Sequence, residues 1–224
     1  MPGPLLILDL SSALYVGLWD GGKTAASRIR PQGTRGEAAH ALVDECLAEA
    51  GIGPEGLAAV AAGTGPGSFT GIRVCCALAL GLAFARRLPV HAFSSLAAIE
   101  ACIPRDAERA VAAIAANAGK WYVRPRGGEE ALLSTEALLA LGGPDATLAV
   151  SGEAPGRDRL EAAFGAILPA ETNYDFARVA ALALASPASP EGTLRPNYLS
   201  ASAAEDKLRA GLLGVRTGGP GTAP

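Results

Sequence analysis

A glycine-rich connection between an apolar strand and an apolar helix constrains this chain more than any other segment. Four glycines and one proline lie within residues 63–71, directly after an apolar run that ends at Ala62. Glycine permits positive φ angles, and Ser68 and Thr70 are good N-cap residues for the helix that follows. The sequence therefore predicts the order strand, tight loop, helix. The backbone N–H groups of such a loop, together with the helix dipole, can hold an anion.

Two common phosphate-binding motifs do not fit this loop. A P-loop requires Gly-Lys-Ser or Gly-Lys-Thr, and neither occurs anywhere in the chain. A dinucleotide-binding loop requires a third glycine where Ser68 stands. The alternative hypothesis is that the glycines only allow the strand and the helix to pack closely.

The helix after the loop has no polar face. Residues 74–85 are twelve uncharged residues, followed by two arginines, whereas a surface helix has an apolar stripe and a solvated remainder. Twelve residues are too few to cross a bilayer, so we expect burial in protein. Small residues recur at 77, 81 and 85, which lets another helix approach closely. The covering surface is either a protein partner or the second half of this chain.

Composition excludes several classes of protein. The chain has 224 residues, of which 50% are hydrophobic, and its mean hydropathy is +0.26, which suits one large or two small globular domains. Four cysteines without Cys-x-x-Cys spacing and only two histidines argue against a disulfide, a metal site or a catalytic triad. A net charge of −3 argues against a polycationic nucleic-acid binder. The first residues lack the pattern of a signal peptide or membrane anchor, so a cytoplasmic protein without a cofactor is expected.

The order of predicted elements repeats once along the chain. Apolar strands at 5–10, 14–19 and 24–29 form a meander, followed by a helix at 37–50 and the glycine loop with its helix. A helix from Ser95 to Cys102 follows. A second meander at 109–116 and 120–124 precedes a strand at 147–150 and helices at 135–141, 156–164 and 175–185. We therefore predict two similar α/β halves, at residues 1–102 and 103–210, and a mobile tail at 211–224.

Several motifs together resemble one protein family. The motif from Ile7 to Ser12, the run from Gly65 to Arg73 and Ser94-Ser95-Leu96 are similar, in order and spacing, to the TsaB (YeaZ) family. Residues 151–154 and 196–199 look like further landmarks. The resemblance implies an α/β fold of the duplicated actin/hexokinase/Hsp70-like (ribonuclease H-like) type, with two halves that each contain a mixed sheet and helices. Departures occur at residues 35–37, where only Glu37 agrees with the family pattern, and at 117–119.

The resemblance implies a non-catalytic role in forming N6-threonylcarbamoyladenosine at position 37 of tRNA. Family members bind and activate a metal-bearing catalytic subunit, TsaD, and an ATPase, TsaE, binds that pair. The resemblance also implies a homodimer when the partner is absent, contact with tRNA only through the complex, and no membrane association. The residues that we expect at the partner interface are Gly65, Pro66, Gly67, Ser68, Phe69, Thr70, Gly71, Arg73, Val74, Ala77, Leu78, Leu80, Gly81 and Phe84.

A second candidate site lies at the first hairpin. Asp9, Ser11 and Ser12 follow the first strand, and an acid followed by small polar residues positions phosphate in actin-like ATPases. The alternative is that Asp9 only stabilises the turn. Two other functions therefore stay open: a nucleotide-binding ATPase-like enzyme of the same fold, and an M22-type glycoprotease-like peptidase, which would need a metal or a nucleophile that the sequence does not show.

Overall fold

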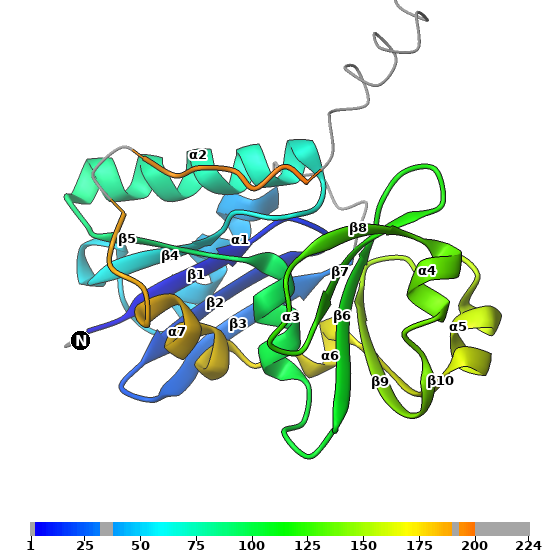
Figure 1. Cartoon of the computed structure of the whole chain (residues 1–224). Helices are drawn as coiled ribbons and strands as arrows, with labels where there is room; N and C mark the ends of the chain where they lie inside the picture. The colour runs from blue at the N-terminus through cyan, green and yellow to red at the C-terminus, as the bar shows by residue number, and fades with distance from the viewer. Residues whose placement is uncertain (1–2, 32–37, 190–192, 200–224) are drawn as a thin grey trace, which may run out of the picture.

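The first half of the chain forms a five-stranded mixed sheet. The computed structural model describes residues 3–31, 38–189 and 193–199 (Figure 1). The strands lie in the order β3-β2-β1-β4-β5, with β1 antiparallel to β2 and parallel to β4. Their bounds are β1 Leu5–Asp9, β2 Leu14–Asp20, β3 Lys23–Arg30, β4 Ala59–Gly63 and β5 Val90–Phe93.

The second sheet repeats this arrangement. Its order is β10-β9-β6-β7-β8, with β6 antiparallel to β7 and parallel to β9. Each sheet thus begins with a three-stranded meander and adds two parallel strands beside its first strand. The bounds are β6 Arg109–Ala115, β7 Lys120–Pro125, β8 Ala131–Ser134, β9 Gly143–Ser151 and β10 Phe164–Pro169.

The helices follow the same repeat. In each half one helix comes after the meander, one follows the fourth strand and one follows the fifth strand. The same order of strands and helices therefore occurs in both halves. This repeat confirms the predicted duplicated α/β fold of the actin/hexokinase type. The helices of the first half are α1 Ala38–Glu49, α2 Phe69–Arg86 and α3 Ser95–Cys102; those of the second are α4 Thr135–Leu139, α5 Arg157–Ala163 and α6 Ala170–Asn173; α7 spans Phe176–Leu184, and a 3-10 turn, η1, spans Pro54–Gly56.

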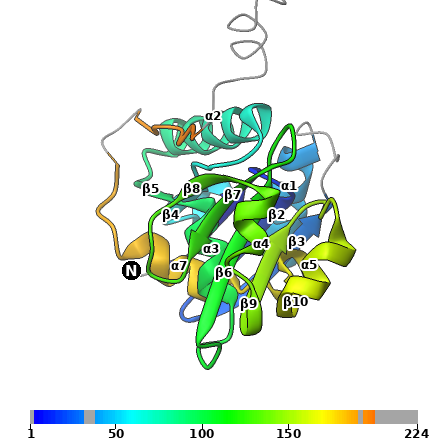
Figure 2. The same ribbon diagram turned by 45° about the vertical axis from the view of Figure 1, so that its right-hand side comes forward.

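Two layers of helices cover the first sheet. One core cluster joins α1 and α2 to one face of the sheet, and a second joins α7 to the opposite face. Gly17 lets α7 approach closely, because a Cβ there would lie 2.2 Å from the Phe176 ring. Helix α3 contributes Ala98 to the core of the first half and Leu96 and Ile99 to that of the second, and it lies between the two sheets in both views (Figures 1 and 2).

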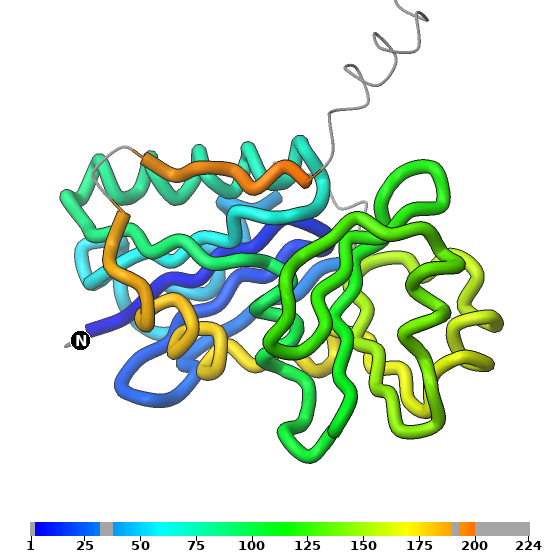
Figure 3. The backbone as a smooth tube through the Cα atoms, in the orientation of Figure 1, coloured from blue at the N-terminus to red at the C-terminus, as the bar shows by residue number. Residues whose placement is uncertain are grey.

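Helix α7 returns from the second half to pack on the first sheet. The chain then runs alongside α2 as an extended segment, residues 193–199, which we call the strap (Figure 3). The division of the chain at residues 102 and 103 stays a prediction. Glu37 and the predicted mobile tail at 211–224 lie outside the described residues.

Most predicted elements are present, with different ends. Ser68 and Ser94 cap α2 and α3 by accepting hydrogen bonds from the N–H groups of Gly71 and Ala97. The uncharged stretch at 74–85 is only part of the helix, because α2 has 18 residues and begins at Phe69, so the argument from twelve residues does not exclude a membrane span. By length and composition it is the one helix of the described chain that could cross a membrane. That is weak evidence for a span, since α2 lies lengthwise on β4 and β1.

Candidate functional site

Glycines bring the loop before α2 against the first hairpin. A Cβ at Gly71 would lie 1.9 Å from the Leu10 carbonyl oxygen, and one at Gly67, where φ is +154°, would lie 2.3 Å from the Ser11 carbonyl oxygen. The Ser68 N–H donates to the same Ser11 oxygen at 2.6 Å. The glycines at these positions are therefore required for close packing.

Several N–H groups of the loop already have protein acceptors. The N–H groups of Thr64 and Gly65 donate to the Phe93 carbonyl oxygen and to Ser95 Oγ, at 2.9 and 3.2 Å. Those of Ser68 and Gly71 also have protein acceptors. The geometry thus favours the hypothesis that the loop supports packing, since four of its N–H groups already have partners.

The predicted phosphate residues lie together but are buried. Asp9 is 1% exposed, Ser11 1% and Ser12 7%. Asp9 Oδ1 accepts a hydrogen bond from the Ser11 N–H at 2.9 Å. Burial raises the pKa of Asp9 above its ordinary 3.8, and hydrogen bonds from Ser11 and Ser95 oppose that rise. A Cβ at Gly63 would lie 2.5 Å from Asp9 Cγ, so the backbone of β4 closes over the carboxyl group.

A buried polar network joins the hairpin to the second half. Ser151 Oγ lies 2.5 Å from both Ser12 Oγ and the Tyr15 hydroxyl. Glu171 Oε1 accepts hydrogen bonds from Ser151 Oγ at 3.1 Å and from the Gly152 N–H at 2.6 Å. Burial, together with the charge of Glu171, raises the pKa of Tyr15, so its hydroxyl stays protonated. Ser12 is thus engaged in a direct contact between the two halves.

Helix α2 leaves one side open. Ile72, Cys75, Cys76, Ala79 and Ala83 are buried against the sheet. The opposite side is exposed at Thr70, Arg73, Ala77, Gly81 and Phe84, which we call the open stripe. Phe84 is 80% exposed, and no described atom lies within 4 Å of the place where a Gly81 Cβ would stand. The stripe is thus an apolar and small-residue surface that the described residues of this chain leave uncovered.

Helix α1 and the strap flank the open stripe. Val74 and Leu78 are half-buried and pack into the core cluster shared with α1. On the other flank, the centre of the Tyr198 ring, which belongs to the strap, lies 4.8 Å from the centre of the Phe69 ring. The Tyr198 hydroxyl accepts a hydrogen bond from Arg73 Nε at 3.3 Å. The Arg73 guanidinium lies 3.8 Å from the Phe69 ring centre. These contacts order the side chains at the N-terminal end of the stripe.

An apolar groove adjoins the C-terminal half of α2. Its volume is about 610 Å³, and its lining includes Leu80, Gly81, Phe84, Leu88 and Val90. With Leu80 in place of Gly81, the residues of the open stripe follow positions 70, 73, 77, 80 and 84. This alternation of three and four residues is the spacing at which one helix packs along another. The stripe and the groove together form a surface that suits a second helix.

The predicted interface residues divide by exposure. Those of the open stripe and Ser68 are exposed; Gly67, Phe69, Gly71, Val74, Leu78 and Leu80 are half-buried; Gly65 and Pro66 are buried within the chain. The last two therefore support the loop and do not form surface. Sequence reasoning did not assign Tyr198 to this surface. The landmark at residues 196–199 was the available signal, but nothing in it indicates contact with Phe69.

The fold and the open helix define the class of protein: a duplicated actin-like α/β protein whose principal exposed feature is a helix face suited to a protein partner.

The model of the family TsaD, tRNA N6-adenosine threonylcarbamoyltransferase, matches residues 36–142. Two solved structures from Pseudomonas aeruginosa are similar over most of their length. One, YeaZ, is 31% identical with a TM-score of 0.64, covering 80% of this chain and 91% of that one. The other, an uncharacterized protein with similarity to peptidase YEAZ, is 29% identical with a TM-score of 0.71, covering 88% and 100%.

Curated relatives carry the corresponding protein name. The tRNA threonylcarbamoyladenosine biosynthesis protein TsaB of Haemophilus influenzae is 42% identical over 122 residues, and that of Escherichia coli is 34% identical over 122 residues. These alignments cover 53% of this chain and 51% and 52% of the relatives, so the match spans about half of their length. The chain belongs to the TsaB (YeaZ) family.

Proposed function

We propose that this chain is the non-catalytic partner subunit of the complex that forms N6-threonylcarbamoyladenosine at position 37 of tRNA. In this proposal it binds and activates a TsaD-type catalytic subunit through the open stripe of α2 and the adjoining groove. A TsaE-type ATPase binds the pair, and tRNA reaches this chain only through the complex. The chain pairs with a second copy when the catalytic subunit is absent, and it acts in the cytoplasm.

One observation carries the proposal: the exposure of the open stripe in the isolated chain. Phe84 is 80% exposed and lies one turn from Gly81 and next to an apolar groove of about 610 Å³. Such a surface is typical of a protein interface, in which an apolar centre is buried between partners. The relatives named TsaB indicate which pathway the partner belongs to.

The hairpin supports a binding role over a catalytic one. Asp9 and Ser12 are buried, and Ser12 contacts Ser151 of the second half directly. A nucleotide at this junction would have to break that contact and the hydrogen bonds of Glu171. The ATPase-like alternative therefore requires the two halves to open, and no observation favours it.

Reconstitution tests the proposed function. The purified chain, a TsaD-type subunit and a TsaE-type subunit from one source are incubated with unmodified tRNA, threonine, bicarbonate, ATP and the enzyme that makes the threonylcarbamoyl adenylate. Mass spectrometry of digested tRNA should show the modified nucleoside only when this chain is present with the TsaD-type subunit. Full modification without this chain, or modification by this chain without a TsaD-type subunit, contradicts the proposal.

A further inference from the structure

The charged residues of α2 and of the strap are all arginines. Helix α2, the residue that caps its C-terminus and the strap together span residues 69–87 and 193–199, and these contain Arg73, Arg86, Arg87 and Arg195 but no aspartate, glutamate or lysine. The chain as a whole has a net charge of −3. The surface that we propose as the partner site is thus basic in an acidic protein.

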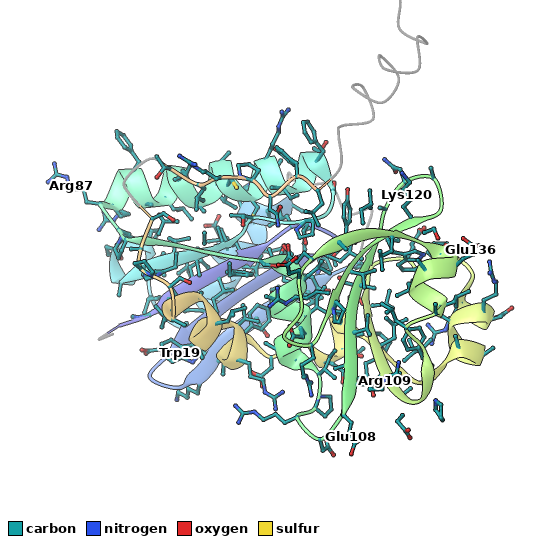
Figure 4. All side chains as sticks on the ribbon, viewed as in Figure 1. Trp19, Arg87, Glu108, Arg109, Lys120 and Glu136 are labelled. Atoms are coloured by element: carbon teal, nitrogen blue, oxygen red, sulfur yellow. The ribbon has the colours of Figure 1, made fainter. Side chains whose placement is uncertain are left out.

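These four arginines have no carboxylate partner within the described chain. The eight ion pairs found there involve other arginines, at 28, 124, 126, 157, 159 and 178. Glu55, in the turn η1 that contacts α2, pairs with none of the four within 4 Å. All four arginines are exposed, and Arg87 projects away from the body at the outer end of α2 (Figure 4). Their charges are therefore available to a partner.

The three arginines of α2 and its C-cap lie towards the two ends of the apolar surface. Arg73 is near the start of α2 and Arg87 is 14 positions later, which is about 21 Å along a helix at 1.5 Å per residue. Ala77, Gly81 and Phe84 occupy the middle. An apolar centre with a charged rim is typical of a protein interface. A nucleic acid would instead favour a continuous basic surface along its phosphates.

We propose, on the basis of the proposed function, that this surface selects a protein partner whose facing helix carries carboxylates at both ends of a small-residue seam. A second copy of this chain fits the same apolar centre less well. If two copies of α2 pack antiparallel about Gly81, Arg73 of each lies near Arg86 and Arg87 of the other; if they pack parallel, each arginine lies near its own counterpart. Like charges thus oppose self-pairing and favour an acidic partner.

The two kinds of pairing predict opposite responses to salt. Salt shortens the screening length from about 10 Å at 0.1 M to about 3 Å at 1 M. Attraction between arginines and carboxylates weakens as salt rises, whereas repulsion between arginines also weakens and so self-pairing improves. Dissociation constants for the chain with a TsaD-type subunit, and for the chain with itself, are measured by analytical ultracentrifugation at 0.05, 0.15 and 0.5 M NaCl.

We expect the dissociation constant with the TsaD-type subunit to rise about tenfold or more over this range, and that for self-pairing to fall. The variant with Arg73→Glu and Arg87→Glu should bind the TsaD-type subunit at least about tenfold more weakly at 0.05 M and lose the salt dependence. A control with Lys23→Glu and Arg105→Glu changes the charge equally at exposed positions at the start of β3 and after α3, and should bind as the wild type does. Circular dichroism confirms that each variant is folded.

Each other outcome overturns a stated claim. Binding to the TsaD-type subunit that does not weaken with salt, or that is equally weakened in the control, contradicts the charge proposal but leaves the proposed function standing. No binding at any salt concentration contradicts both. Charge-dependent binding of unmodified tRNA or of vesicles containing 30% phosphatidylserine by the chain alone, lost in the Arg73→Glu and Arg87→Glu variant, would assign the arginines to nucleic acid or lipid and overturn the proposal.

Discussion

Replacement of Gly81 by leucine should stabilise the isolated chain and weaken its pairing. Apart from the backbone of α2 itself, no described atom lies within 4 Å of a Cβ at this position, so a side chain can begin here without a clash. Glycine within a helix costs about 0.8–1 kcal/mol relative to alanine, and leucine is close to alanine. A gain of about 0.5–1 kcal/mol raises the melting temperature of a chain of this size by roughly 1–4 °C.

The same leucine would stand at the centre of the seam where we expect the partner helix. Overpacking of a closely packed contact typically costs about 1–3 kcal/mol, which corresponds to an affinity loss of about 5-fold to 140-fold. Isothermal titration calorimetry with the TsaD-type subunit measures this loss, and differential scanning calorimetry measures the melting temperature. Stabilising the monomer while weakening its complex is a combination that a damaged fold does not produce.

A matched control uses Ala181→Leu. Ala181 is exposed on α7, and α7 covers the opposite face of the first sheet from α2. This variant adds the same side chain to an exposed helical position and should leave the affinity unchanged. If Gly81→Leu raises the melting temperature and binds as tightly as the wild type, the centre of α2 is not the docking surface, and the reasoning from its exposure is refuted.

Three further predictions concern buried and partly buried polar residues. Asp9→Asn should stabilise the chain, because burial raises the pKa of Asp9 and the folded protein therefore loses stability as pH rises above the ordinary value of 3.8. The gain in the free energy of unfolding, measured with urea, should increase from pH 4 upward and then level off. A gain that is constant with pH would contradict this. Tyr15→Phe should lower the free energy of unfolding by about 1–3 kcal/mol, since it leaves the junction network without its hydroxyl; an unchanged denaturation midpoint would count against the network. Asn197 Nδ2 donates to Glu130 Oε2 at 2.7 Å, so a double-mutant cycle of Asn197→Ala and Glu130→Gln should show a coupling of about 0.5–3 kcal/mol, and additive effects would mean that this contact does not hold the strap.

Much of the fold follows from short-range signals in the sequence. The first meander combines apolar runs with a turn at Asp20 to Gly22, and the second combines them with a turn at residues 117–119, so both sheets could be predicted. Strands β5, β8 and β10 were not predicted, and two of them, β8 and β10, show why. The first has only four residues, and the second contains a glycine, ends in proline and lies between two short helices, so neither shows the alternation typical of a strand.

The open stripe could be predicted only in part. The absence of charge in residues 74–85 indicated that α2 contacts protein on more than one side, but apolar residues lie all around the helix, so periodicity does not tell which side faces the sheet. Which side of α2 faces the sheet depends on where β4, α1 and the strap lie. The contact of Arg73 with Tyr198 joins residues 125 positions apart, and no local pattern reports such a pair.

Footprinting of Phe84 tests the central claim most directly. Hydroxyl radicals label exposed aromatic rings, and Phe84 is 80% exposed in the isolated chain. Trp19, which is half-buried at the end of β2 and away from α2 (Figure 4), is the internal reference. We expect labelling of Phe84 to fall several-fold when the TsaD-type subunit is bound while that of Trp19 stays the same. Equal labelling of Phe84 in the chain diluted until it is monomeric and in a complex verified by ultracentrifugation would contradict docking through α2.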